Sequence, residues 1–401
     1  MKPKISHSIT TTILGLASLV GFTPGFAMAD DATNPPRFII TDLGAGHEPQ
    51  SISDAGLVVG KSFLWQDGQV TDLPDMPGYV CTARSVNSSG LAVGDCSKPA
   101  EDNHAVFWAD DGSIVDLGTL NSKGAYVTGI NNDGMIVGIT WSEKYGELRA
   151  FECDKRGLIY RRLLGEPIAK AVGVNNRGDV VGRYGEVANE TQEGNRDAIL
   201  WHDGKVTDLG DFEPTAINDN GAVVGNRNFA PLAIGGAFRR DSISDLHEYA
   251  PAPVDNKGPD SVDSRSNPLQ TAGGYFGGYG WSSPAHAVIW VDGKLTSLST
   301  PGFDFAFARG INNAGDIVGC AYDKLSTAAV LWRNGQCFDL NQCVVDGSDW
   351  KLSVANAINS NGRIVGEGTH SGVLTGFLLT PVVPAAAVEQ PAKGGRRRRY
   401  R

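Results

Sequence analysis

Side chains that could carry out chemistry recur along this sequence instead of gathering at one place. Six aspartates each precede a leucine at the end of an apolar stretch: Asp42, Asp72, Asp116, Asp208, Asp245 and Asp339. A carboxylate can act as a general acid or base, but an active site needs one constellation and not six equivalent copies. We therefore expect these aspartates to protect outer strands or to cap turns.

Other short motifs lack the context that their chemistry requires. Residues 55–62 fit a loose phosphate-loop pattern, but they belong to a repeated hairpin and do not open a helix. Asn218-Asp219-Asn220-Gly221 resembles a fragment of a calcium loop, but equivalent segments have no carboxylate. His104 and His286 have no second histidine at metal-ligand spacing. The sequence therefore predicts no catalytic residue, no metal ligand and no cofactor.

Five aromatic residues stand where the repeated units of the chain differ. They are Trp141, Tyr184, Phe229, Tyr279 and Tyr322. Exposed aromatic rings can stack on sugars or anchor a partner protein, because they offer a large contact area at low entropic cost. The alternative is that they pack beneath their own loops, as large side chains commonly do. They form the candidate binding face.

The six cysteines allow one firm pairing. Cys81 and Cys96 lie symmetrically about Asn87-Ser88-Ser89-Gly90, so they should face each other across a hairpin and form a disulfide. Cys337 and Cys343 are a weaker pair. Cys153 replaces a tryptophan found in other units, which predicts a buried free thiol. The pairing of Cys153, Cys320, Cys337 and Cys343 stays open.

These residues sit on a repeat of about 44 residues that fills most of the chain. Each unit has a branched residue followed eight positions later by a glycine. The branched residues are Ile52, Val86, Ile130, Val174, Ile217, Leu269, Ile311 and Ile358, and the glycines are Gly60, Gly94, Gly138, Gly182, Gly225, Gly277, Gly319 and Gly366. This period is typical of four-stranded propeller blades.

Each unit predicts two hairpins with tight turns. The first contains an Asn-x-x-Gly turn and the second a turn such as Asp67-Gly68 or Asp203-Gly204. In the fifth unit we place the second hairpin at 236–239 and 242–246. The connections between the two hairpins vary in length, and alternate connections of such a sheet lie at opposite ends. All variable loops therefore share one face, which favours a scaffold with one interaction face.

The two ends of the chain predict a closed ring. Residues 37–44 match the fourth strand of a unit, which the last unit, ending at 375–380, lacks. Pairing these segments removes a free sheet edge. We predict an all-β fold, a single β-propeller of about eight four-stranded blades. The alternative is seven blades, with the divergent sixth unit at 268–277 outside the ring.

The remaining segments suggest export. Residues 1–29 have the charge, apolar core and small residues of a signal peptide, residues 30–383 hold the repeats, and residues 384–401 form a flexible Pro/Ala linker with an arginine-rich tail. A net charge of −10 argues against general nucleic-acid binding, and no apolar run is long enough for a membrane span. We expect an exported protein, periplasmic or extracellular.

The repeat resembles the extracellular HAF repeat family, named for the His-Ala-Phe that begins its third strand. The resemblance rests on residues 104–108, 150–153, 198–201 and 286–290, and it covers roughly residues 38 to 380. It implies an exported repeat protein of unknown activity. Some relatives end in a sorting signal with a membrane helix; this chain lacks that helix, so sorting and anchoring are not implied.

Two functions follow as hypotheses. The first is a non-enzymatic binding or surface-interaction protein whose variable-loop face recognises a glycan, an envelope polymer or a partner protein. The second is a propeller hydrolase or lyase acting on polysaccharide, with loop carboxylates such as Glu143, Glu186 or Asp260. A pair of carboxylates about 5 to 10 Å apart in a pocket would favour the enzyme.

Overall fold

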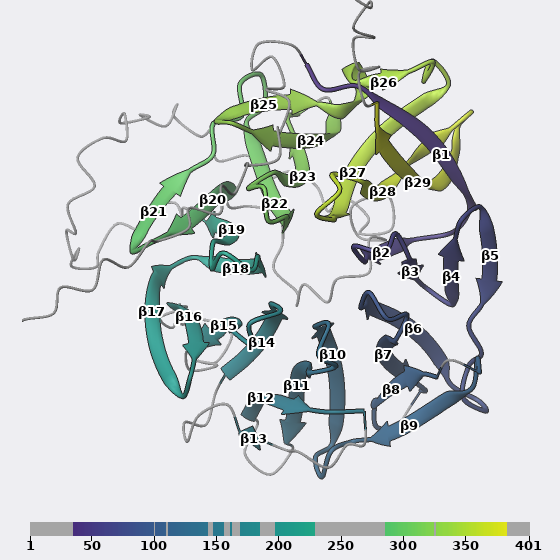
Figure 1. Cartoon of the computed structure of the whole chain (residues 1–401), viewed down its shortest axis with the longest axis vertical. Coiled ribbons are helices and arrows are strands. Elements are labelled where there is room, and N and C mark those ends of the chain that lie inside the picture. The colour runs from purple at the N-terminus through teal and green to yellow at the C-terminus, as the bar shows by residue number, and fades with distance from the viewer. Residues whose placement is uncertain are drawn as a thin grey trace, which may run out of the picture. The chain divides into compact units, whose positions relative to one another are not determined.

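A computed structural model shows a seven-bladed β-propeller (Figure 1). It describes residues 35–99, 101–109, 111–142, 147–155, 161–162, 169–184, 197–228, 285–324 and 326–382. Six blades are four-stranded antiparallel sheets and the seventh has a fifth, parallel strand; in each blade the first strand lies nearest the axis. The proposed signal peptide and the arginine-rich tail lie outside the described residues.

The first three blades follow the chain strand by strand. Blade 1 has β2 (Pro49–Ile52), β3 (Val58–Gly60), β4 (Phe63–Gln66) and β5 (Gln69–Asp72). Blade 2 has β6 (Val80–Val86), β7 (Ala92–Ser97), β8 (His104–Trp108) and β9 (Ile114–Gly118). Blade 3 has β10 (Gly124–Ile130), β11 (Ile136–Ser142), β12 (Glu147–Cys153) and β13 (Arg161–Arg162).

The next three blades keep the same order. Blade 4 has β14 (Ala169–Val174), β15 (Val180–Tyr184), β16 (Asp197–His202) and β17 (Lys205–Asp211). Blade 5 has β18 (Glu213–Ile217), β19 (Val223–Asn228), β20 (Ala285–Val291) and β21 (Lys294–Ser297). Blade 6 has β22 (Phe305–Ile311), β23 (Ile317–Tyr322), β24 (Thr327–Arg333) and β25 (Gln336–Asp339).

Blade 7 joins the two ends of the chain, as predicted. It contains β27 (Trp350–Ile358), β28 (Ile364–His370), β29 (Val373–Pro381) and then β1 (Phe38–Ala45), which pairs antiparallel with β29 from Phe38↔Pro381 to Ala45↔Thr375. After the short 3-10 helix η1 (Leu340–Gln342), β26 (Val344–Val345) adds a parallel fifth strand outside β1. Phe38 and Leu43 of β1 are buried. The strand therefore closes the ring and covers an apolar surface.

The blade number is seven, so the prediction of about eight blades was wrong and its alternative is right. The second strand of blade 5, β19, pairs directly with β20, from Val223↔Trp290 to Asn228↔Ala285. Two repeat units of the sequence thus supply one sheet. The strands placed at 236–239 and 242–246, and the divergent unit at 268–277, lie outside the described residues. A turn asparagine of blade 5, Asn218, bonds directly to blade 6 at Asn312, which makes the two blades neighbours.

The glycine eight positions after the branched residue is required by a close approach of two strands. The inner strand of every blade carries a β-bulge where it pairs with the second strand. A Cβ on Gly94 would lie 2.0 Å from the carbonyl oxygen of Thr82, and one on Gly319 would lie 1.8 Å from that of Phe307. No side chain fits at such distances, so the repeat keeps glycine there.

The apolar core is divided among the joints between neighbouring blades. The described residues form seven clusters, one at each joint. Between blades 1 and 2, for example, Leu57 and Val59 pack against Ala83 and Trp108. Each blade is therefore stabilised by both neighbours, and a blade with a missing neighbour exposes one apolar face to water.

The cysteines follow the predicted hairpin register. Cys81 and Cys96 are directly opposed on β6 and β7 and form a disulfide. Cys153 is a buried free thiol, and burial raises its pKa to about 12. It pairs with Ile136 where Trp108 pairs with Ala92 in blade 2, so it does occupy a tryptophan position. Cys337 and Cys343, the weaker pair, are both free.

Removing β1 should destabilise the whole ring. A chain that starts at His47 loses the buried Phe38 and Leu43 and leaves the edge of β29 unpaired. We expect a loss of unfolding free energy on the order of 5 kcal/mol, from two large apolar side chains and a row of hydrogen bonds. Thermal unfolding measured beside a control chain that starts at Pro35 tests this; coinciding melting curves would contradict closure by β1.

Candidate functional site

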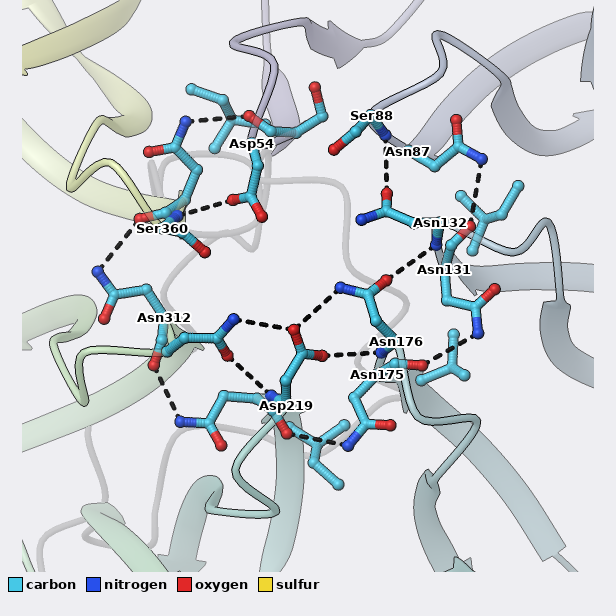
Figure 2. A pocket seen from close by; sticks show the side chains of 18 of the residues that line it. Asp54, Asn87, Ser88, Asn131, Asn132, Asn175, Asn176, Asp219, Asn312 and Ser360 are labelled. Atoms are coloured by element: carbon cyan, nitrogen blue, oxygen red, sulfur yellow. Dashed lines mark hydrogen bonds between the residues drawn. The ribbon is translucent and has the colours of Figure 1, made fainter. Parts of the chain in front are cut away.

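A polar pocket of about 150 Å³ lies on the propeller axis, at the face that carries the tight turns of the inner hairpins (Figure 2). Every blade lines it with the last residue of its inner strand and the next two residues of the turn. In blade 3, these are Ile130, Asn131 and Asn132. The sevenfold repeat thus places seven equivalent turns around one cavity, which we call the axial pocket.

Asparagines at the first turn position link the blades in one direction around this pocket. Six blades have asparagine there: Asn87, Asn131, Asn175, Asn218, Asn312 and Asn359. Each Nδ2 donates to the main-chain carbonyl of the equivalent residue in the next blade, at 2.9 to 3.2 Å. All six side chains are buried. Because buried amides without partners are costly, these bonds fix the spacing of the blades.

The same asparagines also hold their own turns. The Oδ1 of Asn218, for example, accepts bonds from the backbone N–H of Asn220, at 3.1 Å, and of Ala222, at 2.9 Å. The turn ends with Gly221 at a positive φ of 82°, which a glycine adopts without strain. The interpretation of these motifs as structural turns and not calcium loops is therefore supported by their hydrogen bonds.

A second tier of bonds runs through the next turn residue, which faces the pocket. The backbone N–H of Asn132 donates to Oδ1 of Asn176, and that of Asn176 donates to Oδ1 of Asp219, at 2.9 and 2.8 Å. Asp219 Oδ2 also accepts from Nδ2 of Asn176 and of Asn313. Burial alone would raise the pKa of Asp219, but these hydrogen bonds outweigh it and hold the pKa below its usual value. Asp219 thus accepts three hydrogen bonds, from the blades on both sides of it.

Further from the turns, the bulged residues of the inner strands connect neighbouring blades. Thr128 Oγ1 donates to the carbonyl of Ala171 at 3.1 Å, and Thr215 Oγ1 donates to that of Ala308 at 3.0 Å. At the joint of blades 7 and 1, Asn356 Nδ2 donates to the carbonyl of Pro49 at 2.9 Å. The bulge therefore aims each of these side chains at the next blade.

The buried carboxyl of Glu367 lies beside these bonds from the bulged residues. Glu367 on β28 is only 4% exposed, and its Oε1 accepts a bond from Asn356 Nδ2 at 3.0 Å. Burial raises its pKa to about 7; the Asn356 bond lowers it, the nearby Glu48 raises it, and Arg309 lowers it. Arg309 itself donates to Asn356 Oδ1 at 3.0 Å. The sequence analysis missed this residue; of the equivalent positions only Asp95 in blade 2 also carries a buried carboxyl, and its partner is Arg84.

The predicted aromatic face is only partly within the described residues. Trp141, near the loop end of β11, is 39% exposed. Tyr322 at the end of β23 is half-buried and its ring lies against Phe305 and Phe307, at centroid distances of 5.1 and 5.8 Å. Tyr184 ends β15, but its side chain, Phe229 and Tyr279 lie outside the described residues. Trp141 thus fits the binding interpretation and Tyr322 the packing alternative, and the face as a whole stays a prediction.

Four of the six recurring aspartates cap turns, as expected, Asp339 among them through the N–H of Asn341 at 2.9 Å. Asp42, Asp116 and Asp208 each accept a bond from the backbone N–H two residues later, at 2.6 to 2.8 Å. The donating N–H groups belong to Gly44, Gly118 and Gly210, which have positive φ. Asp245 lies outside the described residues. Asp116 also bonds to Nδ1 of His104, at 2.9 Å, so that histidine has a structural partner.

Two kinds of feature are absent from the described residues. Within them no three histidine, cysteine or acidic side chains come together as metal ligands would. None of the helices there is long and apolar enough to cross a membrane.

The chain resembles solved β-propellers in fold. The propeller domain of the Trilobed protease from Pyrococcus furiosus is 8% identical, with a TM-score of 0.49 over 86% of this chain and 94% of that one. YCF48 bound to a D1 peptide is 11% identical, with a TM-score of 0.43 over 87% and 99%. TolB from Acinetobacter baumannii is 12% identical, with a TM-score of 0.40 over 73% and 64%.

Sequence comparison adds no relative: no protein-family model and no curated protein matches the chain. Similarity at these identities and TM-scores assigns no activity to the chain.

Replacing a turn asparagine should cost far more than replacing its exposed neighbour. Asn218→Ala removes one donor to blade 6 and the acceptor of two backbone N–H groups. We expect a loss of about 2 to 4 kcal/mol of unfolding free energy, and at most about 1 kcal/mol for Asn220→Ala, whose single bond to Asn313 is exposed. Urea denaturation measures both; equal losses would show that the asparagine bonds do not hold the blades.

Glu367 should make stability depend on pH. Its pKa in the folded state, about 7, lies above the ordinary value of 4.5, so its contribution is complete below pH 4.5 and is lost as pH rises to about 7. Glu367→Gln keeps the acceptor for Asn356 and cannot ionise. The unfolding free energy of the wild type relative to this variant should fall by at most about 3 kcal/mol between pH 4.5 and 8. A constant difference over that range would contradict the raised pKa.

Proposed function

We propose that this is an exported, non-enzymatic binding protein that recognises its ligand with the variable-loop face of the propeller. The observation that carries the proposal is the exposed indole of Trp141. It stands on β11, which pairs with β10 on one side and β12 on the other through seven-residue strands. A rigid, exposed aromatic side chain suits binding because little entropy is lost when a ligand covers it.

Other apolar side chains are exposed at the same face. Val80 begins the inner strand of blade 2, and Val373 and Leu374 follow the turn between β28 and β29; their exposed fractions are 56%, 55% and 39%. Each lies at the strand end opposite the tight inner turns. An exposed apolar group is commonly part of an interaction site. These residues support a partner protein or a glycan as the ligand.

Export is supported by the disulfide between Cys81 and Cys96, since such bonds persist in oxidising compartments. The signal-like residues 1–29 and the resemblance to the HAF repeat family support the same location, periplasmic or extracellular. These features belong to the proposal together with the binding face.

The rival function, a hydrolase or lyase acting on polysaccharide, has one described feature in its favour. Glu367 has a pKa of about 7, a value suited to a general acid, and Glu48 lies near enough to raise it. The loop carboxylates Glu143, Glu186 and Asp260 lie outside the described residues. The enzyme would release oligosaccharides, whereas a binding protein retains them.

Binding should depend on Trp141. A glycan array and a pull-down of envelope components are run with the wild type and with Trp141→Ala, which should weaken binding by at least about tenfold through loss of one stacked aromatic contact. Val206→Ala is the matched control, because Val206 is exposed to a similar degree, 37%, beside the tight outer turn of blade 4.

The same glycans are incubated with the wild type and analysed for released oligosaccharides. Retention without release supports the binding protein. Release that Glu367→Gln abolishes would favour the enzyme, and equal binding by the wild type and Trp141→Ala would overturn the assigned face.

A further inference from the structure

The ring of asparagine bonds is interrupted at one joint. Blade 1 has Ser53 where the other six blades have asparagine, and serine has no amide to reach the next blade. Ser53 Oγ instead accepts the backbone N–H of Leu57 in its own turn, at 3.2 Å. Among the described residues, the Asn87 carbonyl therefore accepts one bond, from the N–H of Gly90, whereas that of Asn131 accepts two, from Gly134 and Asn87.

The second tier is interrupted at the same joint. Blade 2 has Ser88 where blades 3 to 6 have asparagine or aspartate. In the joint of blades 3 and 4, the backbone N–H of Asn132 donates to a side-chain oxygen of Asn176. The N–H of Asp54 has no equivalent side-chain acceptor among the described residues, because Ser88 is too short.

Within the described residues, only the joint of blades 1 and 2 lacks both bonds. The joint of blades 6 and 7 has Ser360 in the second tier but keeps the first, through Asn312 and Asn359. The joint of blades 7 and 1 keeps both, through Asn359 to Ser53 and Ser360 to Asp54. One side of the axial pocket therefore presents a main-chain acceptor on Asn87 and a main-chain donor on Asp54.

The chemistry that satisfies such a pair is shown by the rest of the ring. At the joint of blades 2 and 3, a side-chain carboxamide donates to the carbonyl of Asn131, and another accepts from the N–H of Ser88. We propose that the joint of blades 1 and 2 binds a primary carboxamide of a ligand, such as the side chain of asparagine or glutamine in a peptide. Its NH₂ donates to the Asn87 carbonyl and its oxygen accepts from the Asp54 N–H.

The surroundings fit a small neutral group of this kind. Asn87 lines the pocket and is only 4% exposed, while Asp54 lines it and is exposed to solvent. Asp54 Oδ1 already accepts the N–H of Ser360, at 2.8 Å. The carboxylate of Asp54 is therefore engaged at the joint of blades 7 and 1. This site is on the face opposite Trp141, so it is independent of the proposed function.

The NMR resonance of the Asp54 backbone amide reports directly on binding at this joint. Acetamide is titrated into isotope-labelled full-length mature protein, and amide resonances are recorded by two-dimensional NMR. We expect a saturable shift of the Asp54 resonance. N,N-dimethylacetamide, which has the same carbonyl but no N–H, should bind at least about tenfold more weakly, because it leaves the Asn87 carbonyl without a donor.

Two variants separate this joint from the rest of the pocket. Ser53→Asn with Ser88→Asn introduces the residues that other blades carry, so the chain should fold and the shift should be lost. Ser360→Asn makes the same change at the joint of blades 6 and 7 and should leave acetamide binding unchanged.

Three results would overturn the proposal: no saturable shift of Asp54, an equal shift in the Ser53→Asn/Ser88→Asn protein, or equal binding of N,N-dimethylacetamide. A shift with ethylene glycol but not with acetamide would also overturn it, by assigning the joint to hydroxyl groups. A loss of glycan binding in Trp141→Ala leaves this outcome untouched, so the two proposals fail separately.

Discussion

The side-chain amide of the turn asparagine connects six of the seven blades to the next one at the axis. It holds its own turn through Oδ1 and reaches across the joint through Nδ2, as Asn175 does toward Asn218. Since the six asparagines are almost completely buried, an unpaired amide would cost about 1 to 3 kcal/mol. The spacing and the tilt of the inner strands must satisfy these bonds, and the apolar joints pack around that arrangement.

The backbone of the inner hairpin makes this arrangement possible. Its bulge brings a carbonyl oxygen against the second strand, where only glycine fits, and turns Thr128, Thr215 or Asn356 toward the next blade. Turn bonds at one end and bulge bonds further along thus hold neighbouring inner strands at two heights. The outer strands carry less of this network, which leaves the loop face free to vary between blades.

The blades differ from one another at two surfaces, and the side chains at these surfaces have different chemistry. The loop face exposes Trp141 and several aliphatic side chains, which suits a large ligand or a partner protein. The axial pocket offers amides, hydroxyls and two carboxylates, and its only joint without either tier of bonds, within the part of the chain that the structure describes, lies between Ser53 and Asn87. Between the two surfaces, the buried carboxyl of Glu367 lies beside the bond from Asn356 to Pro49, so the stability of the joint of blades 7 and 1 should depend on pH.

Much of the fold could be predicted from local patterns, because a propeller repeats one short-range unit. The Asn-x-x-Gly turns, the outer hairpins, the pairing of Cys81 with Cys96 and the closing strand at Phe38 all follow from residues close in sequence or from equivalent repeats. The number of blades does not follow from local patterns. The pairing of β19 with β20 joins segments separated by about 60 residues. Only the curvature of the assembled ring decides that seven sheets close it. The polar ring, the incomplete joint at Ser53 and the buried Glu367 likewise depend on contacts between different blades. Their partners lie about 44 or more residues away in sequence, so burial and hydrogen bonding at the axis appear only in the tertiary structure.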